Sequence, residues 1–171
     1  FYMYGGTISG NSAKVGDPVY GGGVYVEGST KNSGTVGTFH MYAGAISDNT
    51  AYNSKGNSGG AGVYVGEGAA FYLHDGSISG NRVLKSAGSS SGGGVYVGWK
   101  DDDGVFVMDD SSRIENCKAS APYWAYGGGV CVENIYNDSY FKMNGGSIAE
   151  CEAVSTSNYT DHARGGGVCV P

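Results

Sequence analysis

The chain has 171 residues, with 33 glycines, 3 prolines and a formal net charge of −6. The glycines follow no triplet period, which excludes collagen, and the acidic balance gives nucleic acid no basic surface to bind. With 40% hydrophobic residues the chain can bury a core, which excludes a disordered class. No apolar run approaches the ~20 residues that cross a membrane, and no secretory signal opens the sequence.

One repeated block, F-x-M-x-x-G-x-I-S-x-N, opens the chain at Phe1 and recurs from Phe39 and Phe71. Weaker copies begin at Phe106 and Phe141. The copy at Phe106 has one extra residue between its methionine and its isoleucine, which predicts a β-bulge. Because the chain starts inside this block, we expect it to be a segment of a longer repeat protein.

A glycine-rich stretch ending in V-x-V alternates with that block. Its first valines stand at positions 24, 63, 95, 130 and 168, so the steps between copies are 39, 32, 35 and 38 residues. The middle residue is tyrosine in three copies and cysteine in the last two. Five copies of such a unit predict a repeat protein, in which each unit needs its neighbours to bury its apolar face.

The two blocks predict an all-β fold. V-x-V and F-x-M alternate with period two, which is typical of strands with one buried face, and no segment carries a helical apolar stripe. We expect about three short strands in each unit and one coil per repeat of 32 to 39 residues. Five such coils would stack as a parallel β-solenoid, a single domain spanning residues 1–171.

Stacking of equivalent residues assigns the core. Val24, Val26, Phe39, Met41 and Ile46 should point inward in their coils, each beneath its counterpart in the next coil. The asparagine column formed by Asn11, Asn49 and Asn81 should bind turn backbone along the axis, which is a structural role. The glycine triplets are followed by neither Lys-Ser/Thr nor a helix, so we interpret them as corners that need positive φ and not as phosphate loops.

Together, the GGGV-Y-V and F-x-M-x-G-G-x-I-S-x-N blocks resemble the repeats of bacterial adhesin-like surface proteins of the polymorphic outer membrane protein type. The resemblance covers nearly the whole chain. It implies a right-handed parallel β-helix of the pectin lyase-like kind and an extracellular or cell-surface location. In that family the motifs are structural, so no catalytic residues carry over. The cysteines of the last two copies depart from the family pattern.

Outward aromatic residues are the candidate ligand-binding site. Tyr25, Tyr64 and Tyr96 should form a row along the V-x-V strands, and two further columns should face out from the F-x-M strands. These columns are Tyr2, His40 and Tyr72, and Tyr4, Tyr42 and His74. We take Tyr25, Tyr64, Tyr96, Tyr42 and His74 as the site, because stacked aromatic rings can dock sugar rings or a protein surface. The alternative is that tyrosine serves only as a good strand residue, or that loops cover the row.

Segments of variable length separate the blocks and should form loops. Thr50–Ser58, Arg82–Ser91 and Lys118–Tyr126 are rich in serine, asparagine, glycine and lysine. Insertions in repeat proteins gather on loops, often on the binding face. We therefore expect these loops to stand beside the ligand.

Four cysteines mark the last two coils as chemically distinct. Cys117 and Cys151 take the asparagine column, whereas Cys131 and Cys169 take the tyrosine column. Each pair falls in neighbouring coils, where Cα atoms about 5 Å apart allow a disulfide. The alternative is two stacks of free thiols. No C-x-x-C or matching histidine spacing indicates zinc.

No cofactor or metal site is expected. Asp101–Asp103, followed by Asp109 and Asp110, could offer oxygen ligands to calcium, but without EF-hand spacing we interpret them as a solvated loop. His40, His74 and His162 fall in different columns, which argues against a histidine metal site. No Ser-His-Asp set or carboxylate pair beside a basic residue recurs on a strand.

These observations predict a non-catalytic, surface-displayed module for adhesion or ligand binding. Its partner would be a host or matrix glycan or a surface protein. Two alternatives stay open: a polysaccharide lyase or glycosidase, which rests on fold analogy alone, and a structural solenoid that assembles end to end.

Overall fold

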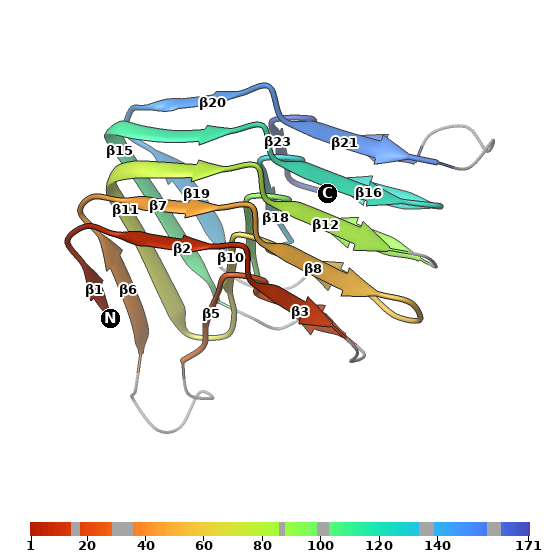
Figure 1. Ribbon diagram of the computed structural model, residues 1–171, viewed down its shortest axis with the longest axis horizontal. Helices are drawn as coiled ribbons and strands as arrows, with labels where there is room; N and C mark the ends of the chain where they lie inside the picture. Colours follow the sequence, from red (N-terminus) through yellow and green to blue (C-terminus); the bar gives the residue numbers. More distant parts are fainter. Residues whose placement is uncertain (15–17, 29–35, 86–87, 99–102, 134–138, 157–161) are drawn as a thin grey trace.

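The computed structural model describes residues 1–14, 18–28, 36–85, 88–98, 103–133, 139–156 and 162–171. These residues form an all-β structure without helices, in which parallel strands stack as a β-solenoid of about four turns. Figure 1 shows the coils lying one beside the next, from β1 and β2 at one end to β20 and β21 at the other. The predicted fold class is confirmed.

Four parallel sheets run along the solenoid axis, which we call sheets A to D. Sheet A carries the F-x-M and I-S segments and has eight of the described strands. They are β1 (Tyr2–Met3), β2 (Thr7–Ser9), β6 (Gly37–Met41), β7 (Ala45–Ser47), β11 (Ala69–Ser79), β15 (Val105–Glu115), β19 (Tyr140–Met143) and β20 (Ser147–Ala149).

Sheet D carries the V-x-V segments, and its five described strands pair in register. They are β5 (Val24–Val26), β10 (Val63–Val65), β14 (Val95–Val97), β18 (Val130–Val132) and β23 (Val168–Cys169). Sheets A and D enclose the main core, in which the predicted inward residues Val26, Phe39, Met41 and Ile46 are buried and Val24 is partly buried.

Sheets B and C arise where loops were predicted, so that prediction is wrong in part. Sheet B contains β3 (Ser12–Lys14), β8 (Thr50–Asn53), β12 (Arg82–Lys85), β16 (Lys118–Ala121) and β21 (Glu152–Ser155). Sheet C contains β4 (Val19–Tyr20), β9 (Ser58–Gly59), β13 (Ser89–Ser91), β17 (Trp124–Tyr126) and β22 (Ala163–Arg164). Each coil thus has more strands than the three expected. Small buried side chains, including Ala51, Val83 and Val19, form a second core from these two sheets.

Glycine corners connect sheet C to sheet D. The first glycine of every triplet has positive φ, between 56° and 66°, at Gly21, Gly60, Gly92, Gly127 and Gly165. A side chain there would also approach the backbone of the same corner, since a Cβ on Gly60 would lie 2.5 Å from the Val63 carbonyl oxygen. Both facts confirm the interpretation of the triplets as corners.

An asparagine ladder holds the turn between sheets A and B. The Asn49 side-chain amide donates to Asn81 Oδ1 at 3.0 Å and to the Ile8 carbonyl at 2.9 Å, and Asn81 Nδ2 donates to the Ile46 carbonyl at 2.9 Å. Asn49 and Asn81 are fully buried, where an unpaired amide would be costly. The structural role predicted for this column is confirmed.

Replacing Ile78 with aspartate should unfold or aggregate the protein, because Ile78 is fully buried in the main core. An unpaired carboxylate there should cost roughly 4 kcal/mol or more. Thermal unfolding followed by circular dichroism measures the effect. Ser77→Asp is the matched control, since Ser77 is partly exposed and pairs with Arg113 on the next strand. Equal melting of the two variants would show that the inward assignment is wrong.

Candidate functional site

The outer side of sheet A carries a patch of six aromatic rings, which we call the aromatic face. One column contains Tyr2, His40 and Tyr72, and the neighbouring column contains Tyr4, Tyr42 and His74. Since F-x-M places Phe39 and Met41 in the core, the residues that alternate with them must point outward. Both columns were predicted from the sequence, and the structure places them as expected.

The rings stack on one another along the solenoid axis. Tyr2 and His40 have centroids 5.1 Å apart and planes at 5°, and Tyr42 and His74 have centroids 4.5 Å apart and planes at 14°. Tyr42 is 39% exposed, and the His74 side chain is 32% exposed. Because neighbouring rings cover each other's faces, the patch presents ring edges, phenol hydroxyls and imidazole nitrogens.

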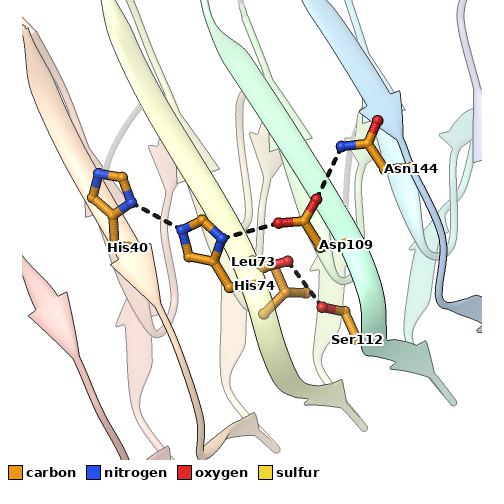
Figure 2. Close-up of polar contacts among 6 residues, drawn as sticks. All are labelled: His40, Leu73, His74, Asp109, Ser112 and Asn144. Carbon is orange, nitrogen blue, oxygen red and sulfur yellow. Dashed lines mark hydrogen bonds and ion pairs between the residues drawn. The ribbon is translucent and has the colours of Figure 1, made fainter.

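A chain of hydrogen bonds crosses this face from coil to coil, as Figure 2 shows. His40 Nδ1 lies 3.1 Å from His74 Nε2, and His74 Nδ1 lies 2.9 Å from Asp109 Oδ2. Asn144 Nδ2 donates to Asp109 Oδ1 at 2.9 Å. Since Asp109 is an acceptor, a neutral His74 donates from Nδ1 and accepts from His40 at Nε2. This arrangement leaves His40 Nε2 as an acceptor.

A β-bulge brings Asp109 into this chain of hydrogen bonds. The register of β11 and β15 shifts between Leu73 and Asp75, so that two residues of β15 stand opposite His74. The extra residue in the fourth coil thus produces the predicted bulge. Ser112 closes the bend, because its buried hydroxyl donates to the Leu73 carbonyl at 2.9 Å (Figure 2).

The surroundings of the chain shift two of its pKa values. Burial, followed by the charges of His74 and of the N-terminal amine, lowers the pKa of His40 below its usual 6.5. The hydrogen bond from Asn144 lowers the pKa of the Asp109 carboxyl, and His74 and Lys142 act in the same direction. Partial burial of Asp109 opposes that change. At neutral pH, His40 is therefore neutral and Asp109 is ionised.

The row of Tyr25, Tyr64 and Tyr96 is not an exposed row, so the expectation that all three rings face solvent is wrong. Tyr25 is 49% exposed, but Tyr64 and Tyr96 are only 3% and 2% exposed. Both point away from the main core, as expected, yet sheet C lies over them and Tyr20 stacks on Tyr64 at 4.5 Å. The Tyr96 hydroxyl donates to the Glu133 carboxylate and lines a cavity of about 290 Å³.

His40 and His74 fall in different columns, yet their side chains are in contact. Columns two residues apart on one strand are neighbours on the same face, so residues on adjacent coils meet diagonally. The sequence signal was present: His40 and His74 differ by one coil and two residues. His162 lies elsewhere, with its ring edge-on to Trp124 at 4.2 Å.

The cysteines lie in the predicted pairs, and all four are free thiols. Cys131 pairs in register with Cys169, and Cys117 precedes Lys118, which pairs with Glu152 directly after Cys151.

Among the described residues, no group of three or more His, Cys, Asp or Glu side chains is arranged to hold a metal ion. Asp101 and Asp102 of the predicted acidic loop lie outside those residues, whereas Asp109 belongs to β15. The described part of the chain also has no helix long and apolar enough to cross a membrane.

No protein-family model, curated protein or solved structure matches the chain. The likeness to adhesin-type repeats therefore depends on the motifs themselves.

The imidazole of His40 should titrate below the usual histidine value. As the pH falls through ~6.5, an unfolded chain binds a proton that folded His40 still resists, so His40 lowers stability between that pH and its folded pKa. Asp109 acts at lower pH, because a depressed carboxyl pKa stabilises the fold above ~4 and loses this effect as the pH falls through the folded value. NMR titration of the His40 ring protons measures the midpoint. A midpoint at or above ~6.5 would contradict the assignment.

Proposed function

We propose that the chain is a ligand-binding module of a cell-surface, adhesin-like protein, and that its aromatic face binds an extended glycan. The observation that carries this proposal is the exposed, stacked array of rings over three coils of sheet A. The location and the right-handed, pectin lyase-like coil belong to the same proposal, and both follow from the repeat motifs.

Rigidity of the array favours binding. Four of the rings lie on paired strands, and those of Tyr4 and Tyr42 directly follow β1 and β6. Neighbouring rings fix each ring plane, as with His40, whose ring centroid lies 5.1 Å from that of Tyr2 and 4.7 Å from that of Tyr72. A ligand therefore orders few side chains when it docks, which lowers the entropic cost of binding. The ladder spacing repeats the same groups along one line, which suits a long ligand.

The polar tips of the rings favour a glycan. Phenol hydroxyls donate and accept hydrogen bonds, and the ring edges offer apolar contact, which matches the mixed surface of a sugar. With a net charge of −6, the chain favours neutral glycans over polyanionic ones.

A polar hollow at the corner of sheet A extends this surface. Its volume is about 280 Å³. Its walls include Asp75, Ser77, Ser111 and Arg113, of which Asp75 directly follows His74 in β11. Hydroxyl, carboxylate and guanidinium groups beside an aromatic patch provide further hydrogen bonds for sugar hydroxyls.

Replacing Tyr42 with serine should weaken glycan binding by about tenfold or more, because the ring stacks between Tyr4 and His74 at the centre of the face. A glycan array identifies ligands of the parent chain, and calorimetry measures their affinity for each variant. Tyr52→Ser is the matched control, since Tyr52 is 37% exposed against 39% for Tyr42 but lies on β8 of sheet B.

Unchanged melting of both variants, with loss of affinity in Tyr42→Ser alone, supports the proposal. Equal affinity of the two variants would exclude the aromatic face as the binding surface. A parent chain that binds no glycan on the array but binds a protein would replace the glycan with a protein ligand.

The His40–His74–Asp109 chain favours one alternative, a polysaccharide lyase. A neutral His40 whose Nδ1 proton is engaged by His74 has Nε2 available as a general base. A glycosidase generally needs two carboxyl groups, one on each side of the glycosidic bond, and the row of hydrogen bonds from His40 to Asn144 contains one carboxyl group, that of Asp109.

Incubation with uronate-containing glycans, followed by measurement of unsaturated ends, should show no turnover under our proposal. Sustained turnover that His40→Ala abolishes and Tyr52→Ser retains would instead establish the lyase. Tyr52→Ser again serves as the control, because it leaves the face of sheet A intact.

A further inference from the structure

Two columns of the solenoid change residue type in the same two coils. The turn column is asparagine at Asn11, Asn49 and Asn81, and the V-x-V column is tyrosine in the same three coils. In the fourth and fifth coils both columns become cysteine. Because one column lies in the turn between sheets A and B and the other lies on sheet D, the joint change places two separate thiol pairs between one and the same pair of coils.

The asparagine ladder therefore ends at the fourth coil. Asn81 Nδ2 reaches Cys117 Sγ only at 3.9 Å, which is a weak contact, whereas Asn49 and Asn81 are joined at 3.0 Å. Cys117 and Cys151 instead direct their thiols to carbonyls within the turn, such as Glu115 at 3.4 Å and Ala149 at 3.2 Å. The amide-to-amide hydrogen bond that joins the earlier coils at this turn is thus replaced by a pair of thiols between the last two.

The position of this pair suits a covalent link. Cys117 lies between β15 and β16, and Cys151 lies between β20 and β21, so neither sits within a strand. Each follows a residue with positive φ, Asn116 at 55° and Glu150 at 53°. The backbones are adjacent, because Glu152 N donates to the Cys117 carbonyl at 2.9 Å. A turn can adjust the two Cβ atoms to the roughly 3.8 Å that a disulfide needs.

The second pair lacks that freedom. Cys131 and Cys169 pair in register inside β18 and β23. Parallel in-register strands hold their Cβ atoms near the ~4.8 Å strand spacing and point them in the same direction. This distance exceeds the usual Cβ separation in a disulfide, and the ladder resists its closure.

We propose that Cys117 and Cys151 form an oxidation site, in which a hydroperoxide converts the two stacked thiols into a disulfide that joins the fourth and fifth coils, while Cys131 and Cys169 stay reduced.

The two thiols differ in accessibility and acidity. Cys151 is partly exposed, whereas Cys117 is 1% exposed. The hydrogen bond from Cys117 lowers the pKa of Cys151 to about 7, against the opposing effects of burial and Glu115. The same interaction and burial raise the pKa of Cys117. Cys151 is thus the thiolate that meets the oxidant first.

The reaction balances in two steps. The Cys151 thiolate attacks the O–O bond, which gives Cys151 sulfenic acid and an alkoxide (hydroxide for hydrogen peroxide), and the alkoxide takes up the proton that Cys151 released. The Cys117 sulfur then attacks the Cys151 sulfur, the S–O bond breaks, and the hydroxyl leaves as water with the Cys117 proton. Two thiols and one hydroperoxide become one disulfide, one alcohol (or water) and one water.

A cavity and an ion pair lie beside Cys117. A cavity of about 290 Å³ opens beside its side chain, with Arg82, Lys118, Glu150 and Glu152 among its lining residues. Lys118 Nζ and Glu152 Oε2 form an ion pair at 2.8 Å across the same two coils.

The test treats the folded parent chain with hydrogen peroxide and maps its peptides without reduction. We expect a Cys117–Cys151 linked peptide and free Cys131 and Cys169. The variant C131S/C169S should lose both of its thiols at the parent rate, whereas the matched control C117S/C151S should keep both.

The mapping on the parent chain decides the matter even if a variant fails to fold. A bridge between Cys131 and Cys169 with Cys117 and Cys151 reduced would overturn the proposal. Conversion of Cys151 to sulfinic acid without a bridge would overturn it as well.

Oxidation should also change stability. The bridge closes a long loop, so the oxidised parent chain should melt ~5 °C or more above the reduced chain, and dithiothreitol should reverse the shift. C117S/C151S should show no shift on the same treatment. An equal shift in that variant would exclude this bridge as the cause.

Discussion

In-register stacking of parallel coils is the constraint on which the rest of this structure depends. Each strand pairs with its equivalent one coil away, so every side chain lies against its own counterpart. The phenylalanine ladder inside the main core shows the effect, because the ring centroid of Phe71 lies 4.8 Å from that of Phe39 and 5.0 Å from that of Phe106. The same rule stacks tyrosine on histidine outside sheet A and cysteine on cysteine at the far coils. A side chain in one coil must therefore pack well against the equivalent side chain in the next coil.

The sequence predicts the parts of the fold that carry large apolar residues. V-x-V and F-x-M show their period through valine, phenylalanine and methionine, and sheets A and D follow from them. Sheets B and C were missed because their core is built from alanines and single valines that do not recur as an apolar alternation. Ala51 is fully buried and Asn53 is 1% exposed, yet both precede Ser54, Lys55 and Gly56, a run that is typical of a loop. A thin core between two sheets needs small residues, and these give little signal in composition.

The candidate site is predicted in part for a related reason. Tyr42 and His74 follow from alternation, since nothing covers the outer side of sheet A in the described structure. Tyr64 and Tyr96 obey the same alternation but are covered by sheet C, which the sequence did not reveal. Pointing away from the main core is thus not equivalent to exposure. The link between His74 and Asp109 depends on the bulge in β15, and a single inserted residue indicates a bulge without giving the direction of its side chains.

The solvent exposure of individual tyrosines tests the four-sheet coil most directly. Hydroxyl-radical footprinting with mass spectrometry reports it for every tyrosine of the native chain at once. The structure predicts fast modification of Tyr42, which is 39% exposed, and protection of Tyr64 and Tyr96, which are 3% and 2% exposed. Modification of Tyr64 and Tyr96 at the rate of Tyr42 would mean that sheet C does not cover sheet D, and would contradict both the four-sheet coil and the choice of the sheet A face as the binding surface.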